Sequence, residues 1–239
     1  MIKGNISSIE TLGLVDGPGI RTIIFMQGCP LRCIYCHNPE TWEVIGGKSF
    51  GPVELIDKIK KYKSYYKASN GGITLSGGEP LLQSKFLLIF LKLCKDNNIN
   101  VALDTCGVGS NDYKKILKYV DLVIFDIKHI NNEGYTKITG KNIKPSLEFL
   151  NYCQKNNKKM WLRQVIMPNF NDNKKDMDEL IAFIKPLKNI EKVELLPYKS
   201  MCKIKYKDLG INYILDNMED MNEEKTKELS DYLNEKINA

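Results

Sequence analysis

Three cysteines within one short segment are the residues of this sequence whose types and spacing most clearly suggest chemistry. Cys29, Cys33 and Cys36 have the spacing C-x3-C-x2-C and follow directly after the apolar run 22–26. Three thiolates on one loop can bind three irons of a [4Fe-4S] cluster and leave the fourth iron without a protein ligand. An open coordination position distinguishes a catalytic metal centre from a structural one. The spacing therefore predicts a catalytic iron–sulfur site.

Two other metal groups could use the same loop. Residues 33–37 match the C-x-x-C-H attachment signal of c-type haem, but haem attachment normally requires export and the sequence begins with no signal peptide. The three cysteines and His37 could instead bind a zinc ion. Adjacent Cys36 and His37 are an awkward pair for one tetrahedral ion, so the spacing favours the cluster over both alternatives.

Further polar residues follow other short apolar runs, namely Gly77, Gly78, Glu79, Asp104, Thr105, Asp126, Lys128 and Arg163. Paired glycines let a backbone approach a ligand closely, and the Glu79 carboxylate could accept a hydrogen bond from an ammonium group. Asp126 and Lys128 are two residues apart on one expected strand, so both side chains point to the same face. A plain salt bridge between these two residues is the simpler alternative.

The elements that would position these residues alternate between strand-like and helix-like patterns. Strands are predicted at 22–26, 72–76, 101–105, 122–128, 159–167 and 192–196, and helices at 52–67, 81–97, 113–119, 145–156, 174–187 and 219–237. This pattern predicts one α/β domain over residues 1–239, with six β-α units and a parallel sheet covered by helices. A partial (β/α)6 barrel and an open doubly wound sheet both fit, and both place the active site at the carboxyl ends of the strands.

The composition is that of an ordinary globular protein, with 43% hydrophobic and 27% charged residues. No apolar run is long enough to span a membrane, and seven cysteines, an odd number, suit a reducing compartment. We therefore expect a cytoplasmic, monomeric protein without a membrane partner. The net charge of +6 is modest, and the lysines are typical of solvated helix faces rather than of a nucleic-acid site. A basic rim could also steer an acidic electron carrier.

The cysteine loop together with Ser76-Gly77-Gly78-Glu79-Pro80 resembles the radical S-adenosylmethionine (SAM) superfamily. Within it, several segments look like the activases of glycyl-radical enzymes, namely residues 16–22, 36–42, 104–107, 121–128, 161–163 and 194–198. The likeness extends over roughly residues 10 to 207. Many relatives carry a ferredoxin-like insert between the cysteine loop and the second strand, and this sequence has none there. The pattern is nearest to the activases that act on pyruvate formate-lyase.

The resemblance implies a [4Fe-4S] cluster bound by Cys29, Cys33 and Cys36, with the unique iron chelated by the methionine part of SAM. One electron from a flavodoxin or a ferredoxin would split SAM and give a 5′-deoxyadenosyl radical. That radical would take a hydrogen from a backbone glycine in the glycyl-radical domain of pyruvate formate-lyase. The protein itself must then position the two substrates and exclude water and oxygen.

The resemblance also implies roles for individual residues. Lys128 and Arg163 would contact the SAM carboxylate, and Asp16 would hold the glycine-bearing peptide. The implied SAM-binding residues are Tyr35, Cys36, His37, Gly77, Gly78, Glu79, Asp104, Asp126, Ile127, Lys128, Arg163 and Ile204. Asp104, Thr105, Ile124 and Asp126 would bind a monovalent cation, Na⁺ or K⁺, beside the same carboxylate. Two aspartates at adjacent strand ends repel each other unless a cation lies between them.

One segment departs from the pattern of the family. Formate-lyase activases have a histidine after the sixth strand that approaches the cofactor, and Ile204 occupies that place here. An apolar contact could replace the polar one, the segment could align differently, or the partner could be another glycyl-radical enzyme such as the anaerobic ribonucleotide reductase. The alternative from a different class is a non-enzymatic metal or electron-carrier protein that uses the same cysteines.

Overall fold

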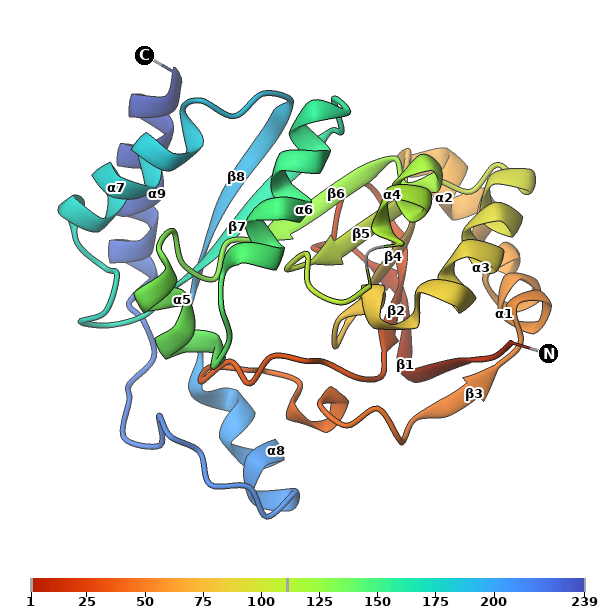
Figure 1. Cartoon of the computed structure of the whole chain (residues 1–239), viewed down its shortest axis with the longest axis horizontal. Coiled ribbons are helices and arrows are strands. Elements are labelled where there is room, and N and C mark those ends of the chain that lie inside the picture. Colours follow the sequence, from red (N-terminus) through yellow and green to blue (C-terminus); the bar gives the residue numbers. More distant parts are fainter. Residues whose placement is uncertain (1, 111, 239) are drawn as a thin grey trace.

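The computed structural model describes residues 2–110 and 112–238, and its centre is one eight-stranded sheet (Figure 1). The strands are β1 (Gly4–Gly13), β2 (Arg21–Met26), β3 (Lys48–Phe50), β4 (Gly72–Gly77), β5 (Val101–Thr105), β6 (Leu122–Asp126), β7 (Met160–Ile166) and β8 (Ile190–Pro197). Their spatial order is β3-β1-β2-β4-β5-β6-β7-β8. The last six strands of this order pair in parallel, and β1 and β3 extend one edge in antiparallel pairing.

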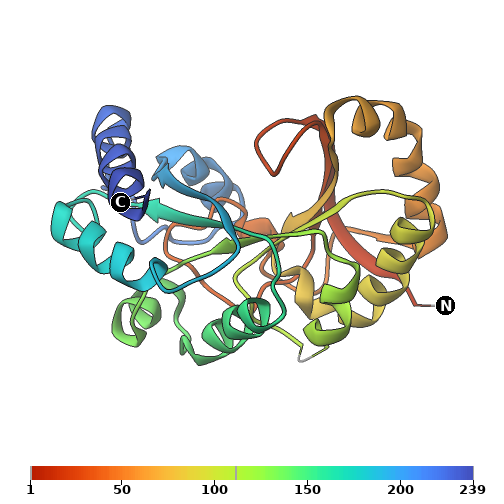
Figure 2. The same ribbon diagram turned by 90° about the horizontal axis from the view of Figure 1, so that it is seen from above.

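Helices cover the outer side of the curved sheet, and the loop after β1 lies on the other side (Figure 2). The α-helices are α1 (Pro52–Ile59), α2 (Lys63–Ser69), α3 (Ser84–Asp96), α4 (Tyr113–Ile116), α5 (Asn132–Thr139), α6 (Lys144–Lys155), α7 (Lys174–Ile184), α8 (Lys203–Asp208) and α9 (Glu223–Asn238). Short 3₁₀ turns are η1 (Pro39–Thr41), η2 (Lys60–Tyr62), η3 (Pro80–Gln83), η4 (Leu117–Tyr119) and η5 (Ser200–Cys202).

The strand order decides between the two architectures that the sequence left open. From β2 to β8 the parallel strands follow one another in chain order, whereas a doubly wound sheet reverses direction part-way. The predicted single α/β sheet with six parallel strands, a partial barrel, is therefore confirmed. The sequence did not predict the antiparallel strands β1 and β3 or the helices α5 and α8.

Alternation along the strands separates the main core from the inner face of the sheet. Leu103, Val123 and Phe125 pack in the large core beneath the helices. Ala102, Leu122 and Ile124 form a separate small cluster with Trp161 on the opposite face. Continuing along that inner face toward the carboxyl ends, β5, β6 and β7 replace apolar residues with Asp104, Asp126 and Arg163.

Among the residues that the structure describes, no helix is long and apolar enough to cross a membrane. All seven cysteines are free thiols.

Candidate active site

A pocket of about 340 Å³ lies at the carboxyl ends of the parallel strands, which is where α/β folds bind ligands. All six parallel strands, the cysteine loop and the loop after β1 contribute to the lining of the pocket. The lining residues are Asp16, Phe25, Cys29, Leu31, Cys33, Tyr35, Cys36, His37, Asn38, Ser76, Gly77, Gly78, Asp104, Thr105, Cys106, Asp126, Lys128, Arg163, Val165, Leu196 and Pro197. The pocket therefore joins the cysteine loop to the charged strand ends in one cavity.

The cysteine loop is fixed by backbone hydrogen bonds to distant segments. The Cys29 N–H donates to the carbonyl of Trp42 at 3.1 Å, and the Ile34 N–H donates to the carbonyl of Ile138 in α5 at 2.9 Å. The Cys36 N–H closes a turn onto the Cys33 carbonyl at 3.0 Å. These bonds hold the loop against the mouth of the pocket without using any of the thiols.

Burial dominates the chemistry of the three thiols. It raises the pKa of Cys29 and of Cys33 to about 12, and it also raises the pKa of Cys36. Iron binds thiolates, so a metal group at this loop must itself supply the positive charge that ionises the thiols. Within the described residues, no three His, Cys, Asp or Glu side chains are arranged to hold a single metal ion. Three thiols on one loop that lines the pocket are a donor set that fits a multi-iron group, in which each thiolate binds a different iron.

Two aspartates lie on the inner face of neighbouring strands, offset from each other by two residues. In the parallel register Asp104 pairs with Ile124, two residues before Asp126 on β6. Burial, followed by repulsion from Asp126, raises the pKa of Asp104 to about 7. Oδ2 of Asp104 accepts a hydrogen bond from Ser76 at 2.6 Å, but Oδ1 is buried and has no partner among the described residues. This oxygen is a ready ligand for a cation or an ammonium group.

Lys128 supplies one of the two cations in the pocket. Its Nζ donates to Oδ2 of Asp126 at 2.8 Å and lies 5.6 Å from the ring centre of Tyr35. Burial disfavours the charged amine, yet Asp126 and its other neighbours hold the pKa of Lys128 well above its usual value. The side chain therefore stays charged inside the pocket.

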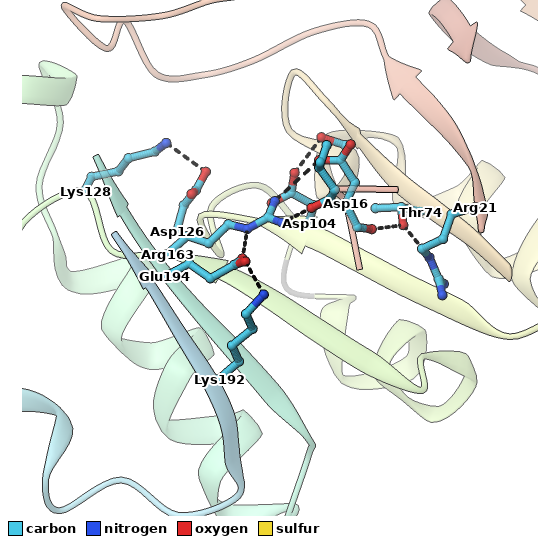
Figure 3. Close-up of polar contacts among 11 residues, drawn as sticks. Asp16, Arg21, Thr74, Asp104, Asp126, Lys128, Arg163, Lys192 and Glu194 are labelled. Carbon is cyan, nitrogen blue, oxygen red and sulfur yellow. Dashed lines mark hydrogen bonds and ion pairs between the residues drawn. The ribbon is translucent and has the colours of Figure 1, made fainter. Parts of the chain in front are cut away.

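Arg163 supplies the second cation and is 7% exposed. Cross-strand register explains its partners, because Arg163 pairs with Asp126 on one side and Glu194 on the other. Its Nε donates to Oε2 of Glu194 at 2.7 Å, while Nη1 contacts Oδ1 of Asp16 at 3.4 Å and Nη2 donates to the carbonyl of Val15 at 2.5 Å. Figure 3 shows Arg163 between β8 and the loop after β1.

Comparison with known proteins agrees with this geometry. Residues 23–184 match the model of the Radical SAM superfamily. The chain belongs to that superfamily. A pyruvate formate-lyase-activating enzyme from Clostridium pasteurianum is 49% identical over 235 residues, covering 98% of this chain and 99% of the relative. One from Staphylococcus epidermidis is 42% identical, covering 98% and 96%.

Solved structures share the radical SAM fold at lower identity. A domain of pyruvate-formate lyase-activating enzyme from Bacteroides vulgatus has a TM-score of 0.57 at 22% identity, covering 70% of this chain and 94% of that domain. SuiB of Streptococcus suis bound to the precursor peptide SuiA has a TM-score of 0.65 at 16% identity, covering 89% and 45%. At these identities the likeness concerns the fold alone.

The structure brings together most of the residues that the radical SAM pattern points to. The three cysteines, Tyr35, His37, Gly77, Gly78, Asp104, Thr105, Asp126, Lys128, Arg163 and Asp16 all line the pocket. His37 Nε2 lies 2.9 Å from the carbonyl of Lys199, which ties it to the segment after β8. Glu194 was not singled out from the sequence, although its pairing with Arg163 follows from the strand register.

Glu79 does not reach the pocket. The side chain is fully buried, and Oε1 accepts hydrogen bonds from the Leu81 N–H at 3.0 Å and from the Thr105 hydroxyl at 2.6 Å. Oε2 faces the backbone N–H and the thiol of Cys106 at 3.1 and 3.0 Å. The carboxyl group thus joins β4 to the loop after β5, and burial raises its pKa.

The two glycines before Glu79 are needed for contact between strands. A Cβ on Gly78 would lie 2.2 Å from the carbonyl oxygen of Gly28, and a Cβ on Gly77, whose φ is +101°, would lie 2.5 Å from the backbone nitrogen of Met26. The two glycines therefore let β4 pack against the end of β2 and the start of the cysteine loop. Both glycines also line the pocket, so their close approach to a ligand stays a prediction.

Three further residues named from the resemblance lie outside the pocket lining. Ile124 and Ile127 are buried, Ile124 in the floor of the inner face. Ile204 lies on α8 with 70% of its surface exposed. No nearby signal in the sequence distinguishes an inward from an outward isoleucine in so short a helix.

Proposed function

We propose that this radical SAM enzyme activates pyruvate formate-lyase by generating a glycyl radical on it. The observation that carries the proposal is the joining, in one pocket, of the three-cysteine loop with Asp104, Asp126, Lys128 and Arg163. The near full-length likeness to pyruvate formate-lyase-activating enzymes at 42–49% identity supports the choice of partner.

In this proposal Cys29, Cys33 and Cys36 bind a [4Fe-4S] cluster. A cluster held there would supply one-electron reduction of SAM, whose cleavage would give methionine and the 5′-deoxyadenosyl radical needed to take a hydrogen from the partner's glycine. The placement of all three cysteines on one loop that lines the pocket supports this assignment. The polypeptide shields this region, since Cys33 and Tyr35 are buried.

The proposed position of SAM follows from the charges in the pocket. Lys128 and Arg163 are the cations that line it and would hold the SAM carboxylate. A monovalent cation, Na⁺ or K⁺, would lie between Asp104 and Asp126, with Thr105 beside them. The unpartnered Oδ1 of Asp104 supports this cation site.

The proposed partner surface lies next to Asp16. Asp16 lines the pocket, and the two preceding residues, Leu14 and Val15, are largely exposed apolar side chains. Such side chains can pack against an inserted peptide, which fits the glycine loop of pyruvate formate-lyase. We further propose a monomer that works in the cytoplasm and takes its electron from a flavodoxin or a ferredoxin. Seven free cysteines support a reducing compartment.

The decisive experiment mixes the reduced protein and SAM with pyruvate formate-lyase or the anaerobic ribonucleotide reductase under anaerobic conditions. We expect a glycyl signal by electron paramagnetic resonance with pyruvate formate-lyase. Cleavage of SAM without a glycyl signal from that enzyme would refute the choice of partner. Cys33→Ala should lose iron and sulfide, whereas the control Cys94→Ala, which changes a thiol buried in the core beneath α3, should retain both. Equal iron contents in the two variants would refute the assignment of Cys33 as a cluster ligand.

A further inference from the structure

A buried arginine holds the loop that follows β1, residues 14–20, in place. Arg21 is the first residue of β2 and is fully buried. Burial lowers the pKa of Arg21 to about 10, so its guanidinium group still carries a charge at neutral pH. A buried charge is costly unless it is hydrogen-bonded. The acceptors around this guanidinium are neutral oxygens, namely the Thr74 hydroxyl at 2.7 Å, the Pro18 carbonyl at 3.0 Å, the Asn100 amide at 3.1 Å and the Ile73 carbonyl.

Thr74 connects this arginine to Asp16 in the loop. Thr74 is fully buried on β4, two residues before Ser76, so both hydroxyls lie on the inner face of the sheet. An arginine side chain only donates hydrogen bonds, so the Thr74 hydroxyl accepts from Arg21. Its own hydrogen is then donated to the backbone carbonyl of Asp16, at 2.5 Å. Figure 3 shows Thr74 between Arg21 and Asp16.

Arg163 holds the same part of the loop from the other side of the pocket. Its Nη1 contacts Oδ1 of Asp16 at 3.4 Å, and its Nη2 donates to the carbonyl of Val15 at 2.5 Å. The side chain of Val15 is 74% exposed, and Gly17 has a φ of +120°, so the neighbours of Asp16 lie outside regular structure. Thr74 therefore fixes the backbone of Asp16, and this backbone sets the direction of the carboxylate that faces Arg163.

We propose that Thr74 and Arg21 position Asp16 for the glycine-bearing peptide of the partner enzyme, by fixing the backbone from which the Asp16 carboxylate reaches the pocket. This inference rests on the proposed function, in which Asp16 holds that peptide. A loop that is free to move spends part of its time in conformations that cannot bind, and the apparent affinity falls by the same fraction. Both residues are positioning residues because they act through Asp16.

The test compares two variants of Thr74 in the assay of glycyl-radical formation. Thr74→Val keeps the branched shape and loses both hydrogen bonds, whereas Thr74→Ser keeps the hydroxyl. In Thr74→Val the KM for pyruvate formate-lyase should rise about tenfold, with kcat nearly unchanged and no rise in the KM for SAM. Thr74→Ser should have the wild-type KM for pyruvate formate-lyase.

A second measurement follows the loop itself and needs no activity. In the cluster-free chain, amide hydrogen exchange over residues 14–20 should be about tenfold faster in Thr74→Val than in the wild type. In Thr74→Ser the exchange should be as slow as in the wild type. Unchanged exchange in Thr74→Val would show that the hydroxyl does not fix the loop.

Gly17→Ala disturbs the same contact from the side of the loop and tests the inference even if Thr74→Val does not fold. The added Cβ would lie 2.9 Å from Cδ of Arg21, and it leaves the Thr74 hydroxyl in place. This variant should also raise the KM for pyruvate formate-lyase. The matched control is Thr226→Val on α9, which removes a buried hydroxyl that donates to the Asn222 carbonyl at 2.8 Å.

The outcomes separate this inference from the proposed function. A wild-type KM for pyruvate formate-lyase in both Thr74→Val and Gly17→Ala would overturn the inference, as would an equal rise in Thr226→Val or Thr74→Ser. An equal rise in the KM for SAM in Thr74→Val would also overturn it, because the loss would not be confined to the peptide. Failure of the wild-type chain to form any glycyl radical would instead overturn the proposed function.

Discussion

Replacing Asp104 with asparagine should remove a pH-dependent cost of folding. Burial raises the pKa of this carboxyl group from 3.8 to about 7, and the charge of Asp126 adds to the effect. Arg163 and the Ser76 hydroxyl offset it only in part. Asparagine keeps the shape of the side chain and an oxygen for Ser76, but it carries no charge.

The sign follows from proton binding. Between about pH 4 and pH 7 the folded chain binds a proton at Asp104 that the unfolded chain releases, so stability falls as the pH rises through this window. Above it, both states are ionised and the cost is constant. Each unit corresponds to about 1.4 kcal/mol, so the two units from pH 5 to pH 7 amount to about 3 kcal/mol. Asp104→Asn should lack this decline.

The assay is urea unfolding of the cluster-free chain at pH 5, 6, 7 and 8, in reducing choline buffers without Na⁺ or K⁺. The quantity compared is the free energy of unfolding of the wild type minus that of Asp104→Asn, which cancels other titrating groups. We expect this difference to fall by about 3 kcal/mol across the range. Adding K⁺ at pH 8 should restore stability to the wild type and not to the variant. Parallel pH profiles for the two proteins would refute the reasoning.

Three further changes test other parts of the site. Glu194→Gln weakens the charge-assisted hydrogen bond from Arg163. In a SAM-cleavage assay the KM for SAM should therefore rise about tenfold, with kcat nearly unchanged. An unchanged KM would contradict a role for Glu194 in positioning Arg163. Gly78→Ala places a Cβ 2.2 Å from the Gly28 carbonyl oxygen and should cost about 3 kcal/mol in urea unfolding, whereas Gly51→Ala, which enters open space, should cost about 0.5 kcal/mol at most. Ile204→His should leave both the KM for SAM and stability (within about 0.5 kcal/mol) unchanged, because the side chain is exposed; a lower KM would show that α8 reaches the pocket.

The sequence alone predicted those features of the fold that depend on the local pattern of apolar residues. The six parallel strands were predicted from apolar runs, and their ends carry the polar residues that line the pocket. Asp104, Asp126 and Arg163 meet because parallel strands end at one edge and side chains alternate between faces. Neither step requires knowledge of the tertiary structure.

The remaining features depend on contacts between distant segments. Glu79 follows a strand end as the pocket residues do, yet hydrogen bonds from Thr105 and Cys106 turn it away. β1 was missed because its outer half is exposed and shows no strand period. The short helix α5 was missed although Asn131 caps its start and Gly140 its end, since its mostly polar residues show little apolar periodicity.

The pocket contains more acidic side chains than a site for a carboxylate alone would need, and the net charge of SAM accounts for this excess. Three aspartates line it, Asp16, Asp104 and Asp126, against two cations, Lys128 and Arg163. These five side chains therefore carry one net negative charge when all five are ionised. SAM has one carboxylate, one ammonium and one sulfonium group, and so carries one net positive charge. Lys128 and Arg163 are already paired with Asp126 and with Asp16 and Glu194. In the proposed binding mode the carboxylate of SAM would compete with these acids for Lys128 and Arg163. The ammonium and sulfonium groups, together with the proposed cation, would then compensate the acids that the carboxylate displaces.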